Sequence, residues 1–465
     1  MGHDGSGVSA LVGLGGFVVT AQLLDDASGE WWLAVETADD RAWCEICGVR
    51  AIGHGRRRVV VRDLPMADRP VVLVWAKRLW RCGEAACSAR TWSEESGEIA
   101  PRAVLTERAR AEICRLVGPG EHSVAQAARN FGVSWHAAMA AVRDHGRPRV
   151  DHLARLGAPS ALGLDETSFL AATAEHPTLL VTGIIDIDEG RVVDVLAARS
   201  AVAVTDWLGS KPAPWLAGIR HVVIDPYQPY ATAVAAGLPD ARLVVDHFHV
   251  IRLANAALDE VRRRTQQATT GHRGRKDDPL YRIRRRLLAR HEDLGPDGFA
   301  GVLAWLDAGD PDGEVGAAYL AKELLRETYL AADAFDARRR LAGFYDYCAS
   351  SDVPELERLG RTIARWETPI LRWHRTRLTN AATEGTNLII KNIKRLGFGF
   401  RNFENYRLRL LLRCGAPWRG CCIDLPSGVL AFGPRRRHDR CRGVQLPGGR
   451  SRSAVLDAAE HGRVA

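Results

Sequence analysis

The pattern of apolar and polar positions changes three times along this chain of 465 residues. The first hundred residues contain apolar runs with alternating polar positions and intervening turns, such as FVVTAQLL and VVLVWAKRLW, which predict β-hairpins. From Leu105 to about Asp144, apolar positions recur every three or four residues and predict helices. After residue 158, strand and helix patterns alternate. We therefore predict a multidomain α+β protein.

Three helices are predicted in the second region, one from TERARAEICRLV and two from SVAQAARNFGVSWHAAMAAVRDH. Gly132 suits a tight turn between the last two, and Ser134 suits the N-cap of the final helix. A helix-turn-helix of this kind would present Ser134, Trp135, His136 and Arg143 to a DNA major groove. A small helical hairpin without a DNA-binding role would have the same pattern. The following GRPRV is predicted to be a linker.

The third region begins with three strand patterns, ALGLDETSF, TLLVTGIIDID and RVVDVLAARS. It continues with helix AVAVTDWLGS, strand HVVIDPY, helix ATAVAAGL and strand RLVVDHFHV. The order βββαβαβ is that of a ribonuclease-H-like fold, in which neighbouring strands bring two carboxylates together and a later helix supplies a third. A basic, helical segment from about 250 to 378 then reads as an insertion before the helix in AATEGTNLIIKNIKRL.

Three acids fit the positions that such a fold needs. Asp165 and Asp225 fall where the first and fourth strands are predicted to end, and Glu384 lies near the start of the late helix. Carboxylates in this arrangement suit two Mg²⁺ ions (or Mn²⁺) in phosphoryl transfer. Asp246 also ends a predicted strand and could replace Asp225, or it could cap the helix that follows. His249, two positions after His247 on that strand, would contact phosphate or support a metal ligand.

The late helix also carries cations. With a helical period, one face bears Glu384, Asn387, Lys391, Lys394 and Arg395, and a different, core-facing side bears Ile389, Ile393 and Leu396. Lys391, Lys394, Arg395 and the nearby Arg401 would hold a DNA backbone. For Glu384 alone, an exposed helix start without any site explains the residue equally well.

Four of the ten cysteines are spaced for metal binding. Cys44 and Cys47 form a C-x2-C pair, and Cys82 and Cys87 form a C-x4-C pair 34 residues later. Two cysteine pairs joined by strand patterns predict a zinc ribbon with a structural Zn²⁺. His54 could replace one cysteine, although two complete pairs make it dispensable.

Composition limits the class of protein. Hydrophobic residues make up 46% and charged residues 26%, as in globular proteins, and no stretch has the roughly 20 apolar residues of a membrane span. The formal net charge of +8 favours a polyanionic partner.

Several blocks carry a family resemblance: WCEICG with RCGEAACSARTWSEE, GLDET, VVIDPYQPY, RLVVDHFHVIRLANAALDEVRR and NAATEGTNLIIKNIKRLGFGFRNFENYRLRLLL. In this order, over roughly residues 10 to 415, the chain resembles the DDE-type insertion-sequence transposases of the ISL-three (ISL3) family. It departs at Pro226–Tyr227, where the family more usually has Met-Ser. The resemblance implies that Asp165, Asp225 and Glu384 are the catalytic triad. It further implies binding to terminal inverted repeats, metal-dependent DNA cleavage and strand transfer, a dimer or larger assembly on double-stranded DNA, and a cytoplasmic, nucleoid-associated location.

The predicted domains are a hairpin and zinc-ribbon domain (1–100), a helix-turn-helix (101–150), the first part of the catalytic core (158–250), a helical insertion (251–378), the rest of the core (379–415) and a disordered basic tail (416–465). Two other functions remain open. A non-catalytic zinc-ribbon and helix-turn-helix regulator would bind DNA without cutting it. A ribonuclease-H-like nuclease for other nucleic acids would not need two sequence-reading modules.

Overall fold

The computed structural model describes residues 9, 10 and 12–418, except for the side chains of Ala382 and Glu384. All structural statements below concern this part of the chain. The predicted tail lies outside the described residues apart from its first three.

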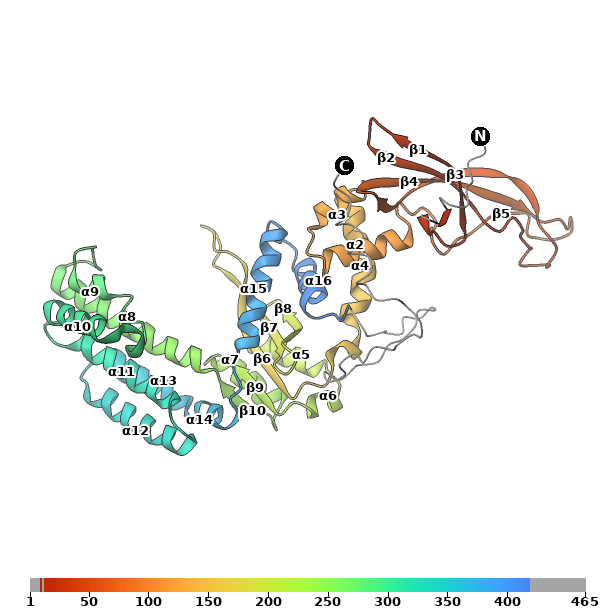
Figure 1. The fold of residues 1–465 in the computed structure, drawn as a ribbon. Coiled ribbons are helices and arrows are strands. Elements are labelled where there is room, and N and C mark those ends of the chain that lie inside the picture. Colours follow the sequence, from red (N-terminus) through yellow and green to blue (C-terminus); the bar gives the residue numbers. More distant parts are fainter. Residues whose placement is uncertain (1–8, 11, 419–465) are drawn as a thin grey trace, which may run out of the picture. The chain divides into compact units, whose positions relative to one another are not determined.

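The N-terminal region is a twisted sheet in the order β1-β2-β4-β3, with β5 beside β4 (Figure 1). Its strands are β1 (Phe17–Asp25), β2 (Glu30–Thr37), β3 (Ile52–Met66), β4 (Arg69–Arg81) and β5 (Thr91–Ser93). The two predicted hairpins are present, since β1 pairs with β2 and β3 with β4, both antiparallel. Ala67 and Asp68 join β3 to β4 with φ of 49° and 60°, which gives the left-handed turn that matches strand twist. Leu33, Leu73 and Trp75 form the centre of a separate core here.

Three helices follow, α2 (Glu107–Val117), α3 (Val124–Asn130) and α4 (Trp135–Asp151). Ser134 is the N-cap of α4, because its Oγ accepts a hydrogen bond from the Ala137 N–H at 3.2 Å. The prediction that GRPRV is a linker is wrong, since α4 continues through Pro148 to Asp151. The reason is packing against α16 (Phe403–Cys414): a Cβ at Gly146 would lie 2.9 Å from Leu412, so glycine permits a close helix crossing.

The second sheet has the order β10-β9-β6-β7-β8. Its strands are β6 (Ala161–Leu170), β7 (Leu179–Asp186), β8 (Arg191–Leu196), β9 (His221–Ile224) and β10 (Arg242–Val245). The first three form antiparallel pairs in sequence, and β9 and β10 add on the other side of β6 in parallel. Short helices connect these strands: η1 (Leu153–Leu156) precedes β6, and α5 (Ala201–Gly209), α6 (Ala213–Ala217) and α7 (Gln228–Gly237) follow β8 and β9.

The last predicted strand is too long. β10 ends at Val245, and the predicted strand residues from His247 to Val250 begin α8 (His247–Thr270) instead. Asp246 has the extended backbone of an N-cap residue, with φ −68° and ψ 130°. The buried residues after it recur with helical spacing, so α8 packs one face against the core.

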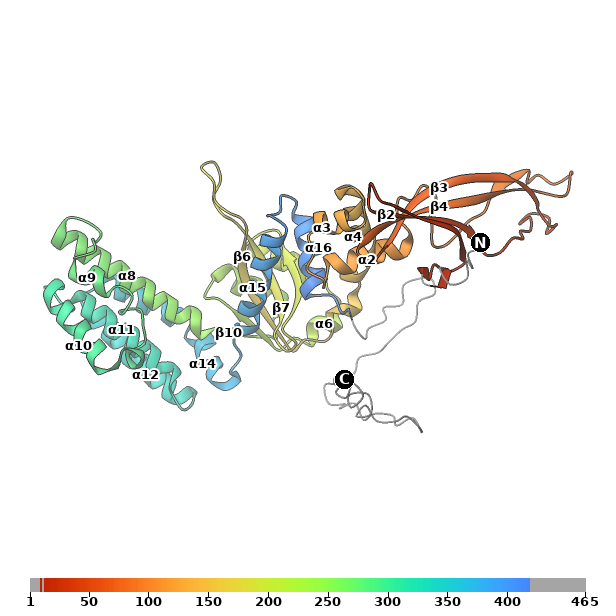
Figure 2. The same cartoon turned by 45° about the horizontal axis from the view of Figure 1, so that its top comes forward.

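Helices occupy the described chain between β10 and the late helix α15 (Ala381–Leu396), with no strand among them. They are α8, α9 (Pro279–Ile283), α10 (His291–Gly309), α11 (Glu314–Tyr329), α12 (Ala334–Ser350), α13 (Pro354–Arg365) and α14 (Glu367–Thr376). One hydrophobic core runs from the second sheet into these helices. In both views α15 and α16 lie beside that sheet, and α16 also contacts α4 (Figure 2). Across the described residues, every helix is too short or too polar to cross a membrane.

A buried ion pair holds α16 to the edge of this sheet. Asp194 on β8 accepts hydrogen bonds from Arg407 of α16 at 2.7 and 3.2 Å and from the Trp207 indole N–H at 2.9 Å. Burial alone would raise the pKa of Asp194, but Arg407 and Trp207 outweigh it, and the pKa lies below the ordinary value. Asp194 therefore anchors a helix that is more than 200 residues away in the sequence.

We expect Asp194→Asn to lower the free energy of unfolding by about 2–4 kcal/mol, because it leaves Arg407 with only the exposed Asp151, 3.5 Å away, as a counter-charge. Since the folded-state pKa is depressed, the ionised pair stabilises the fold above the unfolded pKa. That stabilisation is lost as the pH falls through the depressed value. Urea unfolding at neutral and acidic pH measures both effects. Glu189→Gln, at an exposed turn residue, is the control, and equal stabilities of the two variants would contradict the anchoring role.

Candidate active site and zinc centre

Parallel pairing of β6 with β9 brings two predicted site residues together. Leu164 is the register partner of Ile224, so the next residues, Asp165 and Asp225, are neighbours at the point where β9 ends. Both are buried, with 8% and 6% of their surface exposed. The prediction that Asp165 ends its strand is wrong, because β6 continues to Leu170 as a hairpin with β7.

The two carboxylates are poorly compensated by the protein. Asp165 accepts hydrogen bonds from the Asn387 side chain at 2.8 Å and from the Glu166 N–H at 2.7 Å. Burial and the charge of Asp225 nevertheless raise the pKa of Asp165 to about 6. Asp225 Oδ1 is buried without a hydrogen-bond partner among the described residues. An unpartnered carboxylate oxygen beside a second carboxylate suits a hard divalent cation.

Helix α15 passes directly over this pair of acids. Asn387, which donates to Asp165, lies on α15 one turn after Glu384. The backbone of Glu384 belongs to the first turns of α15, but its side chain is outside the described part of the structure. The helix start is therefore near the acids, while the role of Glu384 stays a prediction.

His249 and Arg252 of α8 lie beside Asp225. His249 Nδ1 is 2.5 Å from Asp225 Oδ2, and Arg252 Nη2 is 3.4 Å from the same oxygen. Burial lowers the pKa of His249, but the contact with Asp225 outweighs it and the pKa is raised. Because these residues are helical, His247 and His249 do not share a face as predicted for a strand. Arg252 was not among the predicted site residues. Its position three residues after His249 would have indicated it, because residues three apart on a helix lie on the same face.

Asp246 shares His249 with Asp225, since its Oδ2 is 4.0 Å from His249 Nε2, but its other neighbours differ. It is at the N-cap position of α8, as one of the two interpretations predicted, but its side chain makes no capping bond. Instead Oδ1 accepts from the Asn380 N–H at 3.4 Å, just before α15, and lies 3.3 Å from His247 Nδ1. Asp246 thus connects the end of β10 to the start of α15.

The faces of α15 differ in part from the prediction. Asn387 and Lys394 turn toward β6, and the Lys394 ammonium donates to the Ser168 carbonyl at 2.7 Å instead of being free for DNA. Ile390 is buried, whereas Ile389, predicted to face the core, is 38% exposed. The packed side follows positions 383, 386, 390 and 393. The neighbouring cations Lys391 and Arg395 are exposed, and neither forms an ion pair with another described residue.

The other residues that were predicted to contact DNA differ in how far they are exposed to solvent. Trp135 and His136 at the start of α4 are exposed, as is Arg401 after α15. Arg143 is half-buried, and its guanidinium donates to the Asn405 side chain of α16 at 3.3 Å. Ser134 is already occupied as the N-cap. Arg143 therefore contributes to the contact between α4 and α16.

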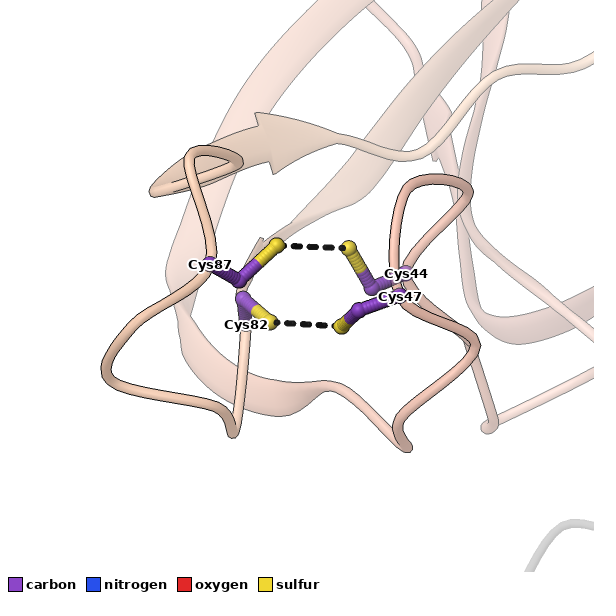
Figure 3. Close-up of side chains that lie close together, drawn as sticks. All are labelled: Cys44, Cys47, Cys82 and Cys87. Atoms are coloured by element: carbon purple, nitrogen blue, oxygen red, sulfur yellow. Dashed lines mark hydrogen bonds between the residues drawn. The ribbon is translucent and has the colours of Figure 1, made fainter.

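The four predicted zinc ligands come together after β2 and β4 (Figure 3). The Cys44–Cys87 and Cys47–Cys82 sulfur distances are 3.7 and 3.5 Å, and all four sulfurs lie within 4.8 Å of one another. Zn–S bonds of about 2.3 Å in a tetrahedron place sulfurs about 3.8 Å apart. Backbone N–H groups, first that of Cys47, lower the pKa of the Cys44 thiol to about 7. This arrangement fits a structural Zn²⁺.

Comparisons with known proteins match both regions. A family model described as the ISL3-type DDE transposase matches residues 162–410, more than half of the chain. A second, described as the zinc-finger of transposase IS204/IS1001/IS1096/IS1165, matches residues 40–87 and so includes all four cysteines.

Curated relatives include the transposase for insertion sequence element IS1001 of Bordetella parapertussis, 25% identical over 381 residues (79% of this chain and 87% of the relative). The transposase for IS1557 of Mycobacterium tuberculosis is 28% identical over 293 residues (58% and 63%). Among solved structures, the Drosophila P element transposase strand transfer complex matches 67% of this chain and 92% of its own, with a TM-score of 0.34 and 10% identity.

For the cysteine cluster, we expect the purified full-length chain to contain about one zinc per molecule. Cys44→Ser or Cys82→Ser should release it and lower the thermal unfolding midpoint, because metal binding stabilises the ribbon. Elemental analysis and calorimetry measure the two effects. Cys348→Ala, at a buried cysteine of α12 away from the cluster, should retain zinc. A zinc-free wild-type chain would exclude the assignment.

For the paired acids, we expect millimolar Ca²⁺, used as a probe, to raise the unfolding midpoint by about 2–4 °C, because a bound cation relieves repulsion between Asp165 and Asp225. Asp165→Asn and Asp225→Asn should each abolish the shift, while Glu189→Gln should keep it. A shift that survives in both aspartate variants would place the cation elsewhere.

Proposed function

This chain belongs to the ISL3 family of transposases, and on that premise we propose that it binds the terminal inverted repeats of an insertion sequence and catalyses strand cleavage and strand transfer. The observation that carries the proposal is the buried pair of Asp165 and Asp225 at adjacent parallel strands, with α15 reaching it through Asn387. A DDE site needs two such acids and a third from a facing helix. Glu384, one turn before Asn387, is our candidate for the third.

The order of strands supports a ribonuclease-H-like core. Three antiparallel strands followed by two parallel ones, with helices between the latter, form the sheet β10-β9-β6-β7-β8. In this arrangement the central strand and its parallel neighbour place their acids at one end of the sheet. The helices from α8 to α14 then separate this sheet from α15 in the sequence without separating them in space.

Asp165, Asp225 and Glu384 would hold two Mg²⁺ ions (or Mn²⁺). When bound, these ions would lower the pKa of the attacking water and stabilise the negative charge on the leaving oxygen. Water attacks the phosphorus at the transposon end and the P–O3′ bond breaks, which leaves a 5′-phosphate and frees the 3′-hydroxyl. That hydroxyl then attacks a target phosphodiester and displaces the 3′-hydroxyl of the target strand. No covalent bond to the protein forms. His249 and Arg252 act as positioning residues, because they fix one oxygen of Asp225 and leave the other free.

DNA would run across the exposed cations near this site. Arg252, Lys391, Arg395 and Arg401 are exposed and can contact phosphates, which gives salt-dependent affinity without sequence choice. Sequence choice would come from a helix-turn-helix formed by α3 and α4, through His136, together with the zinc ribbon. Because two ends are joined in one reaction, we expect a homodimer or larger assembly on DNA.

The test is cleavage of a duplex that carries the inverted repeat flanking the reading frame, in the presence of Mg²⁺. Asp165→Asn, Asp225→Asn and Glu384→Gln should each lower the cleavage rate by at least about two orders of magnitude, since each removes charge that the transition state requires. Asp246→Asn should retain more activity, and its main effect should be a lower unfolding midpoint, because it weakens the contact with the Asn380 N–H.

Binding of the same duplex by all variants without added Mg²⁺ is the control for folding. Equal losses in the Asp246 and Asp225 variants would remove the distinction between these two aspartates. Specific binding by the wild type without any cleavage would instead support the non-catalytic regulator.

A further inference from the structure

A cavity of about 320 Å³ lies between the three N-terminal helices and the segment that joins α15 to α16. Its walls are mainly apolar, with Trp135 and Met139 from α4 on one side and Phe398 and Phe400 on the other. Asn402, Asn405 and Arg401 line the same cavity. A mainly apolar space of this size that also has amide and guanidinium groups in its lining is suited to an aromatic ring that carries hydrogen-bonding groups.

Arg409 is a buried cation that lines this cavity. Only 6% of its surface is exposed, and no carboxylate pairs with it in the described part of the chain. One guanidinium nitrogen donates to the His122 carbonyl at 2.5 Å, while Nη1 is buried without any partner. Burial lowers the pKa of Arg409 to about 10, so it is still charged at neutral pH. A buried, charged donor without an acceptor is costly, and a ligand with an oxygen acceptor would relieve that cost.

Phe398 is exposed to solvent on a turn that backbone hydrogen bonds hold to the end of α15. It is 96% exposed, the largest exposed fraction among the exposed large hydrophobic residues of the described chain. Its backbone is left-handed, with φ 52°, although phenylalanine rarely adopts this conformation. The N–H groups of Phe398 and Gly399 bond back to the Arg395 and Lys394 carbonyls at 3.0 and 2.9 Å. The end of α15 therefore holds an aromatic ring at the mouth of the cavity, opposite Trp135, which is 43% exposed.

We propose that this cavity binds a single unpaired nucleotide of the transposon-end DNA, with its base between Trp135 and Phe398 and an oxygen of the nucleotide at Arg409. The proposal rests on the proposed function, since DNA is taken to be the substrate. An aromatic side chain stacks on any base, and the amides of Asn402 and Asn405 can then read the base edge. Arg401 at the rim can contact the adjacent phosphate.

Helix α15 fixes the distance between this cavity and the paired acids. The 11 residues from Asn387, which donates to Asp165, to Phe398 span about 17 Å at 1.5 Å per residue. B-DNA rises about 3.4 Å per base pair, so the same span is about five base pairs. We therefore place the unpaired nucleotide about five base pairs from the cleaved phosphodiester along DNA that follows α15.

A fluorescence anisotropy experiment tests this with the zinc-loaded, full-length protein and no added Mg²⁺, so that the DNA is bound but not cut. The probes are a short duplex with one extrahelical adenosine, the fully paired duplex, the same bulge with an abasic nucleotide, and free deoxyadenosine monophosphate. We expect the bulged duplex to bind about tenfold more tightly than the paired one, and the abasic bulge to lose that preference, because stacking requires the base.

Phe398→Ala and Trp135→Ala should each remove most of the preference. Phe335→Ala, which removes an 81% exposed phenylalanine from α12, is the matched control and should keep it. Circular dichroism and the unfolding midpoint show whether the variants fold. A preference that persists in both cavity variants, or equal binding of the abasic bulge, would overturn the proposal.

Tight binding of the free mononucleotide would assign the cavity to a soluble ligand and would equally overturn the proposal. Cleavage of transposon ends by the wild type is measured separately. If the wild type cuts DNA but shows no preference for the bulge, only the cavity assignment fails. If it binds the bulge but never cuts, the proposed reaction fails instead.

Discussion

The parallel pairing of β6 with β9 is the contact on which the candidate active site depends. It forces two buried carboxylates, Asp165 and Asp225, into adjacent positions, where burial and the charge of Asp225 raise the pKa of Asp165. A protein that only had to be stable would not keep such a pair. The surrounding residues compensate the negative charge of this pair only in part. Asn387 donates to Asp165, and His249 and Arg252 lie beside Asp225. The uncompensated oxygen of Asp225 marks the place for a cation.

Two contacts bring distant segments to this pair and hold them there. Asp246 accepts from the Asn380 N–H and so ties the start of α15 to the end of β10, across the whole helical insertion. Lys394 ties the other half of α15 to β6 through the Ser168 carbonyl. With both halves fixed, α15 acts as a rigid connection between the acids and the Phe398 turn. Any ligand bound at that turn therefore lies at a constant distance from the acids.

Helix α16 has a comparable role between the N-terminal helices and the second sheet. Its Arg407 pairs with Asp194 on the edge strand, its Leu412 packs on Gly146 of α4, and its Asn405 accepts from Arg143. The proposed DNA-reading helices thus rest on an element of the core. The zinc ribbon is different, because its sheet has a hydrophobic core of its own and its four cysteines come from two local turns.

The sequence by itself determined the features that depend on local pattern. The alternating runs predicted the hairpins, the C-x2-C and C-x4-C spacings predicted the cysteine cluster, and strand ends marked Asp225. The turn at Gly132 and the Ser134 cap were also readable, since capping involves residues three positions apart. The local pattern failed where a tertiary contact outweighed it: GRPRV is helical because of α16, and the segment after Asp246 is helical because it packs on the core.

Only the tertiary structure decided which partners these residues have. Asp194 has no local signal for its role, and Lys394 was predicted to hold DNA, because their partners are more than 200 residues away in the sequence. Arg409 gave no sequence signal at all, since a buried cation without an anion is defined by what surrounds it. A one-dimensional pattern reports the face and the element on which a side chain lies. Long-range packing determines what that face meets, and with it the charge balance of the site.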